Sequence, residues 1–195
     1  MKLQVGVSNR HIHLTEETYR SLFGEEEVIK LKDLKQPGQY ASDKVVTLKT
    51  EKSVIERVRL LMPFRAYNQV EISRTDAYKL GINPPVRNSG DLSDSETVSV
   101  IANGKEVLLK QSTIIATRHI HMDEQFANKA GIKDNQPITV TIKGTKGCYK
   151  DILEEKIIAF SKVSKEAYLE IHMDTDDANA FNLKQDDEVE IDYEV

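Results

Sequence analysis

The chain has 195 residues, between one and two ordinary domains, and with 39% hydrophobic and 30% charged residues it can bury a core, which argues against wholesale disorder. Its formal net charge of -5 excludes the basic excess that is usual in nucleic-acid-binding proteins. No apolar run approaches the roughly 18 residues of a membrane span, and no signal-peptide core is present. Cys148 is the single cysteine, so an intrachain disulfide framework is excluded. These features predict an acidic, soluble, cytoplasmic protein without a nucleic-acid or membrane partner.

Short strands and short helices are predicted along the chain, with frequent turns between them. Alternating apolar and polar residues predict strands at 3–7, 98–100, 138–142 and 189–191. The sequence Asn103-Gly104 predicts a hairpin after the second of these strands. Capping and stop residues predict four short helices, with N-caps at Thr15, Thr75, Asp123 and Asp176 and ends near Gly24, Gly81, Gly131 and Asn182. This pattern favours small β-barrels over a doubly wound sheet.

The sequence repeats itself. Residues 8–14 return as residues 116–122, a shift of 108 positions (119 minus 11). Residues 70–77 align more weakly with residues 171–178, a shift of 101 positions (172 minus 71). The order of the two segments is the same in both halves, so we interpret the chain as an internal duplication.

The histidines are concentrated in the repeated segments, which contain all five: His11, His13, His119, His121 and His172. On a strand, residues i and i+2 point to the same face, so each His-x-His pair can present two imidazoles to one divalent metal ion, zinc in particular. The simpler alternative is that they are core or surface residues of a duplicated strand. By the 101-residue shift, Glu71 corresponds to His172, and each half then offers three ligands, the pattern of a catalytic zinc site with an open fourth position. Without the repeat, Glu71 would read as a solvent-facing strand residue.

Two other kinds of reactive side chain are present. Cys148 lies in a predicted turn without a histidine nearby in sequence, so we interpret it as a structural thiol. Arginines near the histidine segments suit an anionic substrate, because the guanidinium binds phosphate oxygens through a rigid fork; for Arg57 an exposed strand face is the better interpretation. These arginines are Arg10, Arg57, Arg59, Arg65 and Arg118.

Four segments together resemble the phosphate propanoyltransferase family, and the resemblance runs from Val5 to the C-terminus. They are residues 8–14, 84–92, 117–122 and 172–180. Two Arg-His-Ile-His motifs at this separation, followed by an Asp-Thr-Asp segment after the last histidine, make the match specific.

The resemblance implies a mainly β fold with short helices and two small β-barrels, in which the N-terminal strand joins the barrel of the C-terminal half. We therefore expect residues 1–14 and 111–195 to form one barrel and residues 15–110 the other. It implies reversible transfer of a propanoyl or acetyl group between CoA and inorganic phosphate, giving an acyl phosphate. A homodimer is the oligomeric state that the family suggests. Only four residues precede Val5, without the N-terminal extension that targets microcompartment members to their shell, and this favours a free cytoplasmic enzyme.

The resemblance also implies the roles of individual residues. One zinc ion would be held by His11, His13 and Glu71, and a second by His119, His121 and His172. Arg65 matches the arginine that meets phosphate. The positions that match the CoA site are Ser8, Lys32, Arg59, Leu61 and Asn179.

The implied chemistry is direct attack of phosphate on the thioester without an acyl-enzyme. The first zinc would bind the departing CoA sulfur, while the second zinc and Arg65 would hold phosphate. Two alternatives remain open. A zinc-dependent thioester or amide hydrolase would use metal-bound water, and a structural protein would use zinc only to stabilise its barrels.

Overall fold

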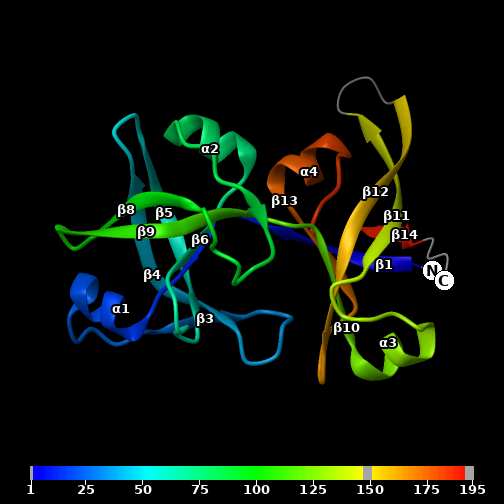
Figure 1. Cartoon of the computed structure of the whole chain (residues 1–195), viewed down its shortest axis with the longest axis horizontal. Coiled ribbons are helices and arrows are strands. Elements are labelled where there is room, and N and C mark those ends of the chain that lie inside the picture. The colour runs from blue at the N-terminus through cyan, green and yellow to red at the C-terminus, as the bar shows by residue number, and fades with distance from the viewer. Residues whose placement is uncertain (1, 147–150, 192–195) are drawn as a thin grey trace. The chain divides into compact units, whose positions relative to one another are not determined.

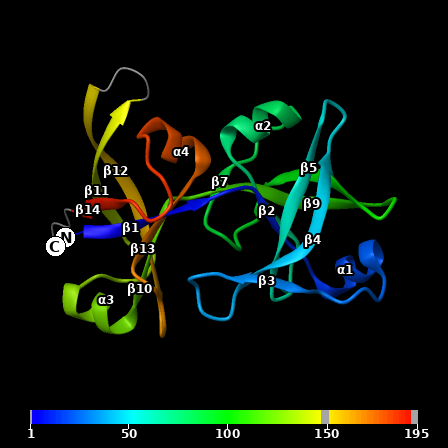
Figure 2. The ribbon, with the colours of Figure 1, turned by 180° about the vertical axis from the view of Figure 1, so that it is seen from behind.

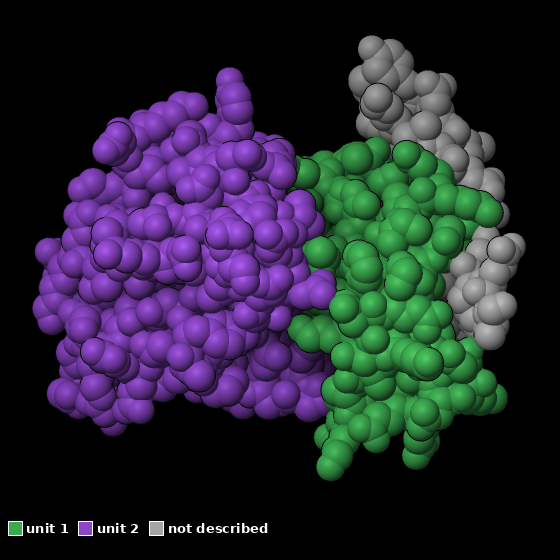
Figure 3. Space-filling view, in the orientation of Figure 1, with its two compact units in different colours: residues 1–8, 117–195 green, residues 9–116 purple. Residues whose placement is uncertain are grey.

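The computed structural model describes residues 2–146 and 151–191, and its elements fall into two compact units (Figure 1). Unit 1 comprises Met1–Ser8 and Thr117–Val195, and unit 2 comprises Asn9–Ala116 (Figure 3). None of the described helices is both long and apolar enough to cross a membrane.

Unit 2 is built around six strands that close into a barrel. Its elements in chain order are β2 (His11–His13), α1 (Glu16–Phe23), β3 (Lys30–Asp33), β4 (Tyr40–Lys49), β5 (Val54–Met62), β6 (Gln69–Glu71), α2 (Arg74–Leu80), β7 (Val86–Arg87), β8 (Glu96–Ala102) and β9 (Lys105–Ala116). The strands pair around the ring in the order β4-β5-β2-β6-β9-β8, and β8 pairs again with β4. Strands β3 and β7 extend this sheet beside β4 and β9 (Figure 2).

Unit 1 contains the second closed barrel. Its elements are β1 (Lys2–Ser8), β10 (His119–Asp123), α3 (Glu124–Ala130), β11 (Pro137–Lys146), β12 (Asp151–Ser164), β13 (Glu170–Asp174), α4 (Thr175–Ala180) and β14 (Glu188–Ile191). The ring order is β1-β13-β10-β12-β11-β14. The N-terminal strand β1 therefore completes the barrel of the C-terminal half, as the family resemblance implied: it runs parallel to β13 and antiparallel to β14.

The two barrels share one pairing scheme, strand for strand. In each, the His-x-His strand runs parallel to one neighbour and antiparallel to the strand that carries the third repeated position: β2 lies between β5 and β6, and β10 between β12 and β13. The strand that immediately precedes each His-x-His motif belongs to the other unit's barrel, β1 before β2 and β9 before β10. This correspondence supports the internal duplication.

The unit boundaries differ from those expected. Residues 9–14 lie in unit 2 because β2 pairs with β5 and β6, and residues 111–116 also lie there because β9 continues its pairing with β6 as far as Ile114. The chain thus changes unit immediately before each His-x-His segment. The amino-acid composition does not mark these unit boundaries, because at both of them the chain passes from one strand to the next without a linker.

The alternation of side chains along the strands places core residues and candidate metal ligands on opposite faces. In β2 and β10 the central residues Ile12 and Ile120 are fully buried in the cores of their units, and Val70 and Ile171 are the corresponding core residues of β6 and β13. Since successive side chains point to opposite faces of a strand, the flanking histidines lie on the outer face of each barrel.

The helix predictions are right in position and partly wrong in their caps. Thr15 and Asp123 cap α1 and α3 as expected, and Gly24 and Gly131 end them. The caps of α2 and α4 are Ser73 and Asp174, each two residues before the expected Thr75 and Asp176. Their side chains accept hydrogen bonds from backbone amides of the first turn, which starts both helices earlier. Asn103 and Gly104 both have positive φ in the β8–β9 hairpin, as their sequence predicted.

Candidate functional site

Unit 2 brings together the first three expected ligands, His11, His13 and Glu71. Strands β2 and β6 place His11 directly opposite Glu71, with His11 Nε2 3.4 Å from Glu71 Oε2. One ligand atom from each of the three residues lies within 4.8 Å of the others, and all three are at most 9% exposed. The structure therefore brings Glu71 to the two histidines, at the third position that the weaker repeat assigns to it.

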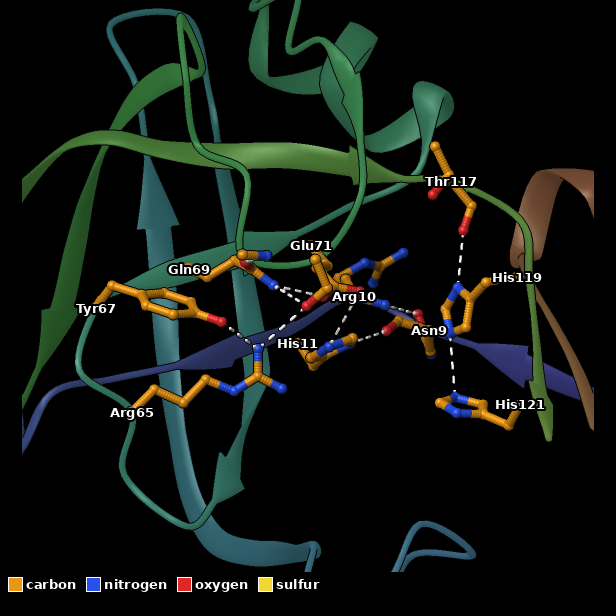
Figure 4. A network of polar contacts seen from close by, with 12 residues as sticks. Asn9, Arg10, His11, Arg65, Tyr67, Gln69, Glu71, Thr117, His119 and His121 are labelled. Atoms are coloured by element: carbon orange, nitrogen blue, oxygen red, sulfur yellow. Dashed lines mark hydrogen bonds and ion pairs between the residues drawn. The ribbon is translucent and has the colours of Figure 1, made fainter. Parts of the chain in front are cut away.

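Hydrogen bonding and burial leave ring nitrogens available in this cluster. His11 Nδ1 lies 2.8 Å from the backbone oxygen of Asn9, which can only accept, so Nδ1 carries a proton and the neutral ring keeps its lone pair on Nε2 (Figure 4). His13 Nδ1 is buried without a hydrogen-bond partner. Burial, together with His11 and Arg65, lowers the pKa of His13 to about 3, so His13 is neutral at pH 7. Burial opposes the charging of His11, but the Glu71 carboxylate raises its pKa.

Unit 1 brings together the other three expected ligands, His119, His121 and His172. The register of β10 and β13 sets His119 directly opposite His172, and the three ligand atoms again lie within 4.8 Å of one another. His119 repeats the arrangement of His11: its Nδ1 lies 2.8 Å from the backbone oxygen of Thr117, and its Nε2 lies 3.2 Å from Nε2 of His121 (Figure 4). Burial and the neighbouring histidines lower the pKa of His121 to about 2.

Both clusters fit a divalent metal ion. Metal binding requires neutral imidazoles, and a ligating histidine usually donates its other ring proton to an oxygen, as His11 and His119 do. The unpartnered buried nitrogen of His13 is also accounted for by a ligand role. The donor sets, two imidazoles with a carboxylate and three imidazoles, are those that zinc accepts.

Arg65 lies next to the unit 2 cluster. Together with His13 it lines a cavity of about 300 Å³, whose other walls come from residues 37–39 and 62–63. The backbone amide of Arg65 donates to the oxygen of Leu14, and its Nη1 contacts Ser89 Oγ at 3.2 Å. A guanidinium and an imidazole facing one cavity form a suitable environment for an anion.

Arg10 and Arg118, which precede the two His-x-His motifs, are paired within their own units. Arg10 Nε lies 2.8 Å from Asp76 Oδ2 at the start of α2. Arg118 makes two contacts of 2.6 Å with Asp177 at the start of α4. Each pair joins the beginning of a His-x-His segment to the helix that follows the third ligand, so these arginines are structural clamps. Arg57 is exposed, as expected.

The expected CoA contacts lie in two groups. In unit 2, Lys32 and Leu61 are both register partners of Ala41, and Arg59 is the register partner of His11, with its Nη1 donating to the backbone oxygens of residues 42 and 43. In unit 1, Ser8 pairs with Asp174 at the start of α4, and Asn179 is exposed near the end of the same helix.

Known proteins of one family are similar to this chain over most of its length. The family model described as phosphate propanoyltransferase matches residues 4–184. The chain belongs to the phosphate propanoyltransferase family. A phosphate propanoyltransferase of Thermotoga maritima is 44% identical over 188 residues, which cover 96% of this chain and 87% of the relative. Proteins of the same name from Rhodopseudomonas palustris and Citrobacter koseri are 39% and 43% identical over 97% and 91% of this chain, and each is covered over 82% of its length.

Family membership identifies the protein as an acyltransferase enzyme. Both candidate metal clusters, Arg65 and all five expected CoA contacts lie within the matched residues 4–184. Cys148 also falls within this range but outside the described residues.

Two buried polar residues beside the clusters were not anticipated from the sequence. Gln69 donates from Nε2 to Glu71 Oε1 at 2.6 Å, and Glu170 Oε2 lies 2.7 Å from His172 Nε2. They are related by the same 101-residue shift (170 minus 69) that relates Glu71 to His172. Extending the weaker repeat by one residue toward the N-terminus would have found them.

Proposed function

We propose that the protein is a metal-dependent phosphate acyltransferase that moves a propanoyl or acetyl group reversibly between CoA and inorganic phosphate. The observation that carries this proposal is the cavity that Arg65 and His13 share. An anion-binding guanidinium beside a candidate metal cluster meets the two needs of the reaction, since phosphate must be held and a thiolate must leave. Family membership supports the choice of acyl transfer over other reactions of anions.

The residues have distinct roles in this proposal. His11, His13 and Glu71 would hold one zinc ion, and His119, His121 and His172 the other. When bound, zinc supplies Lewis-acid stabilisation of negative charge on sulfur and oxygen. Arg65 is the phosphate-binding residue, and Ser89, which contacts its Nη1, helps to orient it. The residues proposed to contact CoA are Ser8, Lys32, Arg59, Leu61 and Asn179.

The bond changes are those of a direct displacement. A phosphate oxygen attacks the thioester carbonyl carbon, forming a carbon–oxygen bond, and the carbon–sulfur bond breaks with its electron pair leaving on sulfur. Arg65 offsets the charge of the attacking phosphate and fixes its position, which removes much of the entropic barrier to attack. No protein nucleophile is required, and no cysteine belongs to either metal cluster among the described residues.

The test is a thiol-release assay on purified zinc-loaded protein with acetyl-CoA and propanoyl-CoA, each with and without phosphate. We expect release that requires phosphate, yields acyl phosphate and is lost on chelation, and returns with zinc. Release that is independent of phosphate would replace the proposal with the hydrolase. Zinc-loaded protein that releases no thiol from either substrate would contradict the proposed reaction and favour metal ions that only stabilise the fold.

A further inference from the structure

Glu170 is a buried carboxylate beside the three-histidine cluster. Its side chain is 2% exposed, and it lies at the start of β13, opposite His121 and two residues before His172. Its Oε2 is 2.7 Å from Nε2 of His172. Burying a carboxylate is unfavourable unless it accepts good hydrogen bonds or faces a cation, so this placement calls for an explanation.

The contact defines which nitrogen of His172 carries the proton. An ionised Glu170 can only accept a hydrogen bond, so a neutral His172 ring beside it carries its proton on Nε2 and keeps the lone pair on Nδ1. His11 and His119 are arranged in the opposite way, because their Nδ1 atoms face backbone oxygens at 2.8 Å. A histidine that ligates a metal generally donates its other ring proton to a carboxylate or a carbonyl group. His172 faces a carboxylate, whereas His11 and His119 face backbone carbonyl groups.

The backbone beside His172 is also adapted to this orientation. Gly6 of β1 is the register partner of His172, and a Cβ atom at this position would come within 2.7 Å of His172 Nε2 and within 2.8 Å of Glu170 Cδ. The ring edge that carries Nε2 therefore rests over β1, in space that only a glycine leaves open. In unit 2 the corresponding strand position, opposite Glu71 in β9, is Ile114.

Unit 2 has a different residue at the position of Glu170. Gln69 lies there, and its amide donates to Glu71 and to Ser89 while its oxygen accepts from the amide of Gly90. Each cluster thus contains one buried carboxylate, but Glu71 is itself a candidate ligand whereas Glu170 lies behind a histidine.

We infer that Glu170 is a positioning residue of the three-histidine site, which fixes His172 as the tautomer that binds metal through Nδ1, whereas His119 binds through Nε2. This inference rests on the second metal ion of the proposed function. It identifies a difference between the two sites, although both arose from one duplicated segment. Carboxylates in this role typically strengthen metal binding by about 10- to 100-fold.

The first test reads the tautomers directly. The chain has only five histidines, so long-range proton–nitrogen NMR spectra of ¹⁵N-histidine-labelled, zinc-loaded protein resolve every ring. We expect His172 to be protonated on Nε2 and zinc-bound through Nδ1, with His11 and His119 reversed. A His172 ring bound to zinc through Nε2, or one that does not respond to zinc, would overturn the inference. This measurement needs no substitution and does not depend on activity.

The second test is Glu170→Gln, with Glu166→Gln as the matched control, because Glu166 is an exposed glutamate in the same unit. Zinc competition against a chromogenic chelator should show about 10- to 100-fold weaker binding at one of two sites for Glu170→Gln and unchanged binding for the control. Unchanged binding in a folded Glu170→Gln protein would contradict the role. Correct tautomers in a protein without phosphate-dependent thiol release would reject the proposed function and leave this inference standing.

Discussion

At the scale of single residues, strand register decides which side chains meet. His11 meets Glu71 and His119 meets His172 because each pair occupies opposite positions on antiparallel strands. Burial then keeps His13 and His121 neutral at pH 7, in the state that a metal ion requires. The clusters are therefore set up by the fold before any ion arrives, and small steric changes beside them should alter metal binding.

Gly6→Ala tests this steric requirement. The added methyl group would overlap His172 and Glu170, so we expect zinc binding to weaken at the three-histidine site and to persist at the other. Gly104→Ala is the control, because an added methyl group would meet nothing within 4 Å and only the positive φ would strain the alanine, by roughly 1–2 kcal/mol. Zinc stoichiometry and competition titrations give the comparison. Two intact sites in Gly6→Ala would show that the backbone of β1 can move away.

Arg65→Lys tests the phosphate role. Lysine keeps the charge but loses the planar fork, so we expect a higher KM for phosphate and a lower kcat, with about a tenfold loss in kcat/KM or more. The same change at Arg57, which is exposed, should leave both constants unaltered. An Arg65→Lys enzyme with wild-type phosphate kinetics would remove Arg65 from the mechanism.

Cys148→Ala tests for a covalent intermediate. Direct displacement needs no thiol nucleophile, so we expect the variant to keep most of its phosphate-dependent thiol release and its full zinc content. Rapid-quench experiments with labelled acyl-CoA should trap no acylated protein from either form. An inactive Cys148→Ala protein that still carries both zinc ions would restore the acyl-enzyme route.

These contacts explain which residues of the site could be predicted from the sequence and which could not. The ligands could be found because a duplication marks them: the five histidines are in repeated segments, and the 101-residue shift adds Glu71. Glu170 lies one residue outside the aligned segment, although the same 101-residue shift relates it to Gln69. Gly6 could not be recognised, since its importance arises from pairing with β13, more than 160 residues away along the chain.

At the scale of elements, the helices after the third ligands are tied back to the His-x-His strands. Ser73 and Asp174 cap α2 and α4, and the Arg10–Asp76 and Arg118–Asp177 pairs then link each helix to the residue before the first ligand. The Ser73-x-x-Asp76 spacing is a recognisable helix-start pattern, but Thr75 is also a residue type that caps helices, and sequence alone did not rank them. The partners of Arg10 and Arg118 depend on tertiary contacts, so both arginines suggested anion binding.

A double-mutant cycle tests the clamp in unit 1. Arg118 and Asp177 form a two-point contact that is partly buried, so we expect Arg118→Lys and Asp177→Asn to show a coupling of about 1 kcal/mol in urea unfolding. The hydrogen bond with Asp177 raises the pKa of Arg118 further above its usual value, so the guanidinium stays charged during the measurement. Strictly additive effects would mean that the contact does not hold α4 in place.

At the scale of the whole molecule, the position of a strand in the sequence does not tell which barrel it joins. Strand β1 is first in sequence, yet Leu3 and Val5 lie in the core of unit 1 with residues of β10–β13, whereas Leu60 belongs to the separate core of unit 2. The strand alternation of residues 3–7 predicted a half-buried strand, but periodicity does not identify its partners. That information came only from the family resemblance, and β1 is also the strand that supplies Gly6 to the three-histidine site.

Leu3→Ala should therefore destabilise strands that lie far from Leu3 in the sequence. Leu3 is 2% exposed, so its truncation should destabilise unit 1 by about 2–5 kcal/mol. Hydrogen exchange measured by mass spectrometry should speed up in β10–β14 and leave β4–β6 largely protected, with weaker zinc binding at the three-histidine site. Leu60→Ala is the reciprocal variant, since Leu60 is fully buried and pairs with Ile12 beside the other cluster. If Leu3→Ala instead accelerated exchange equally in both units, the two barrels would unfold as one cooperative unit and the N-terminal strand would stabilise the entire chain.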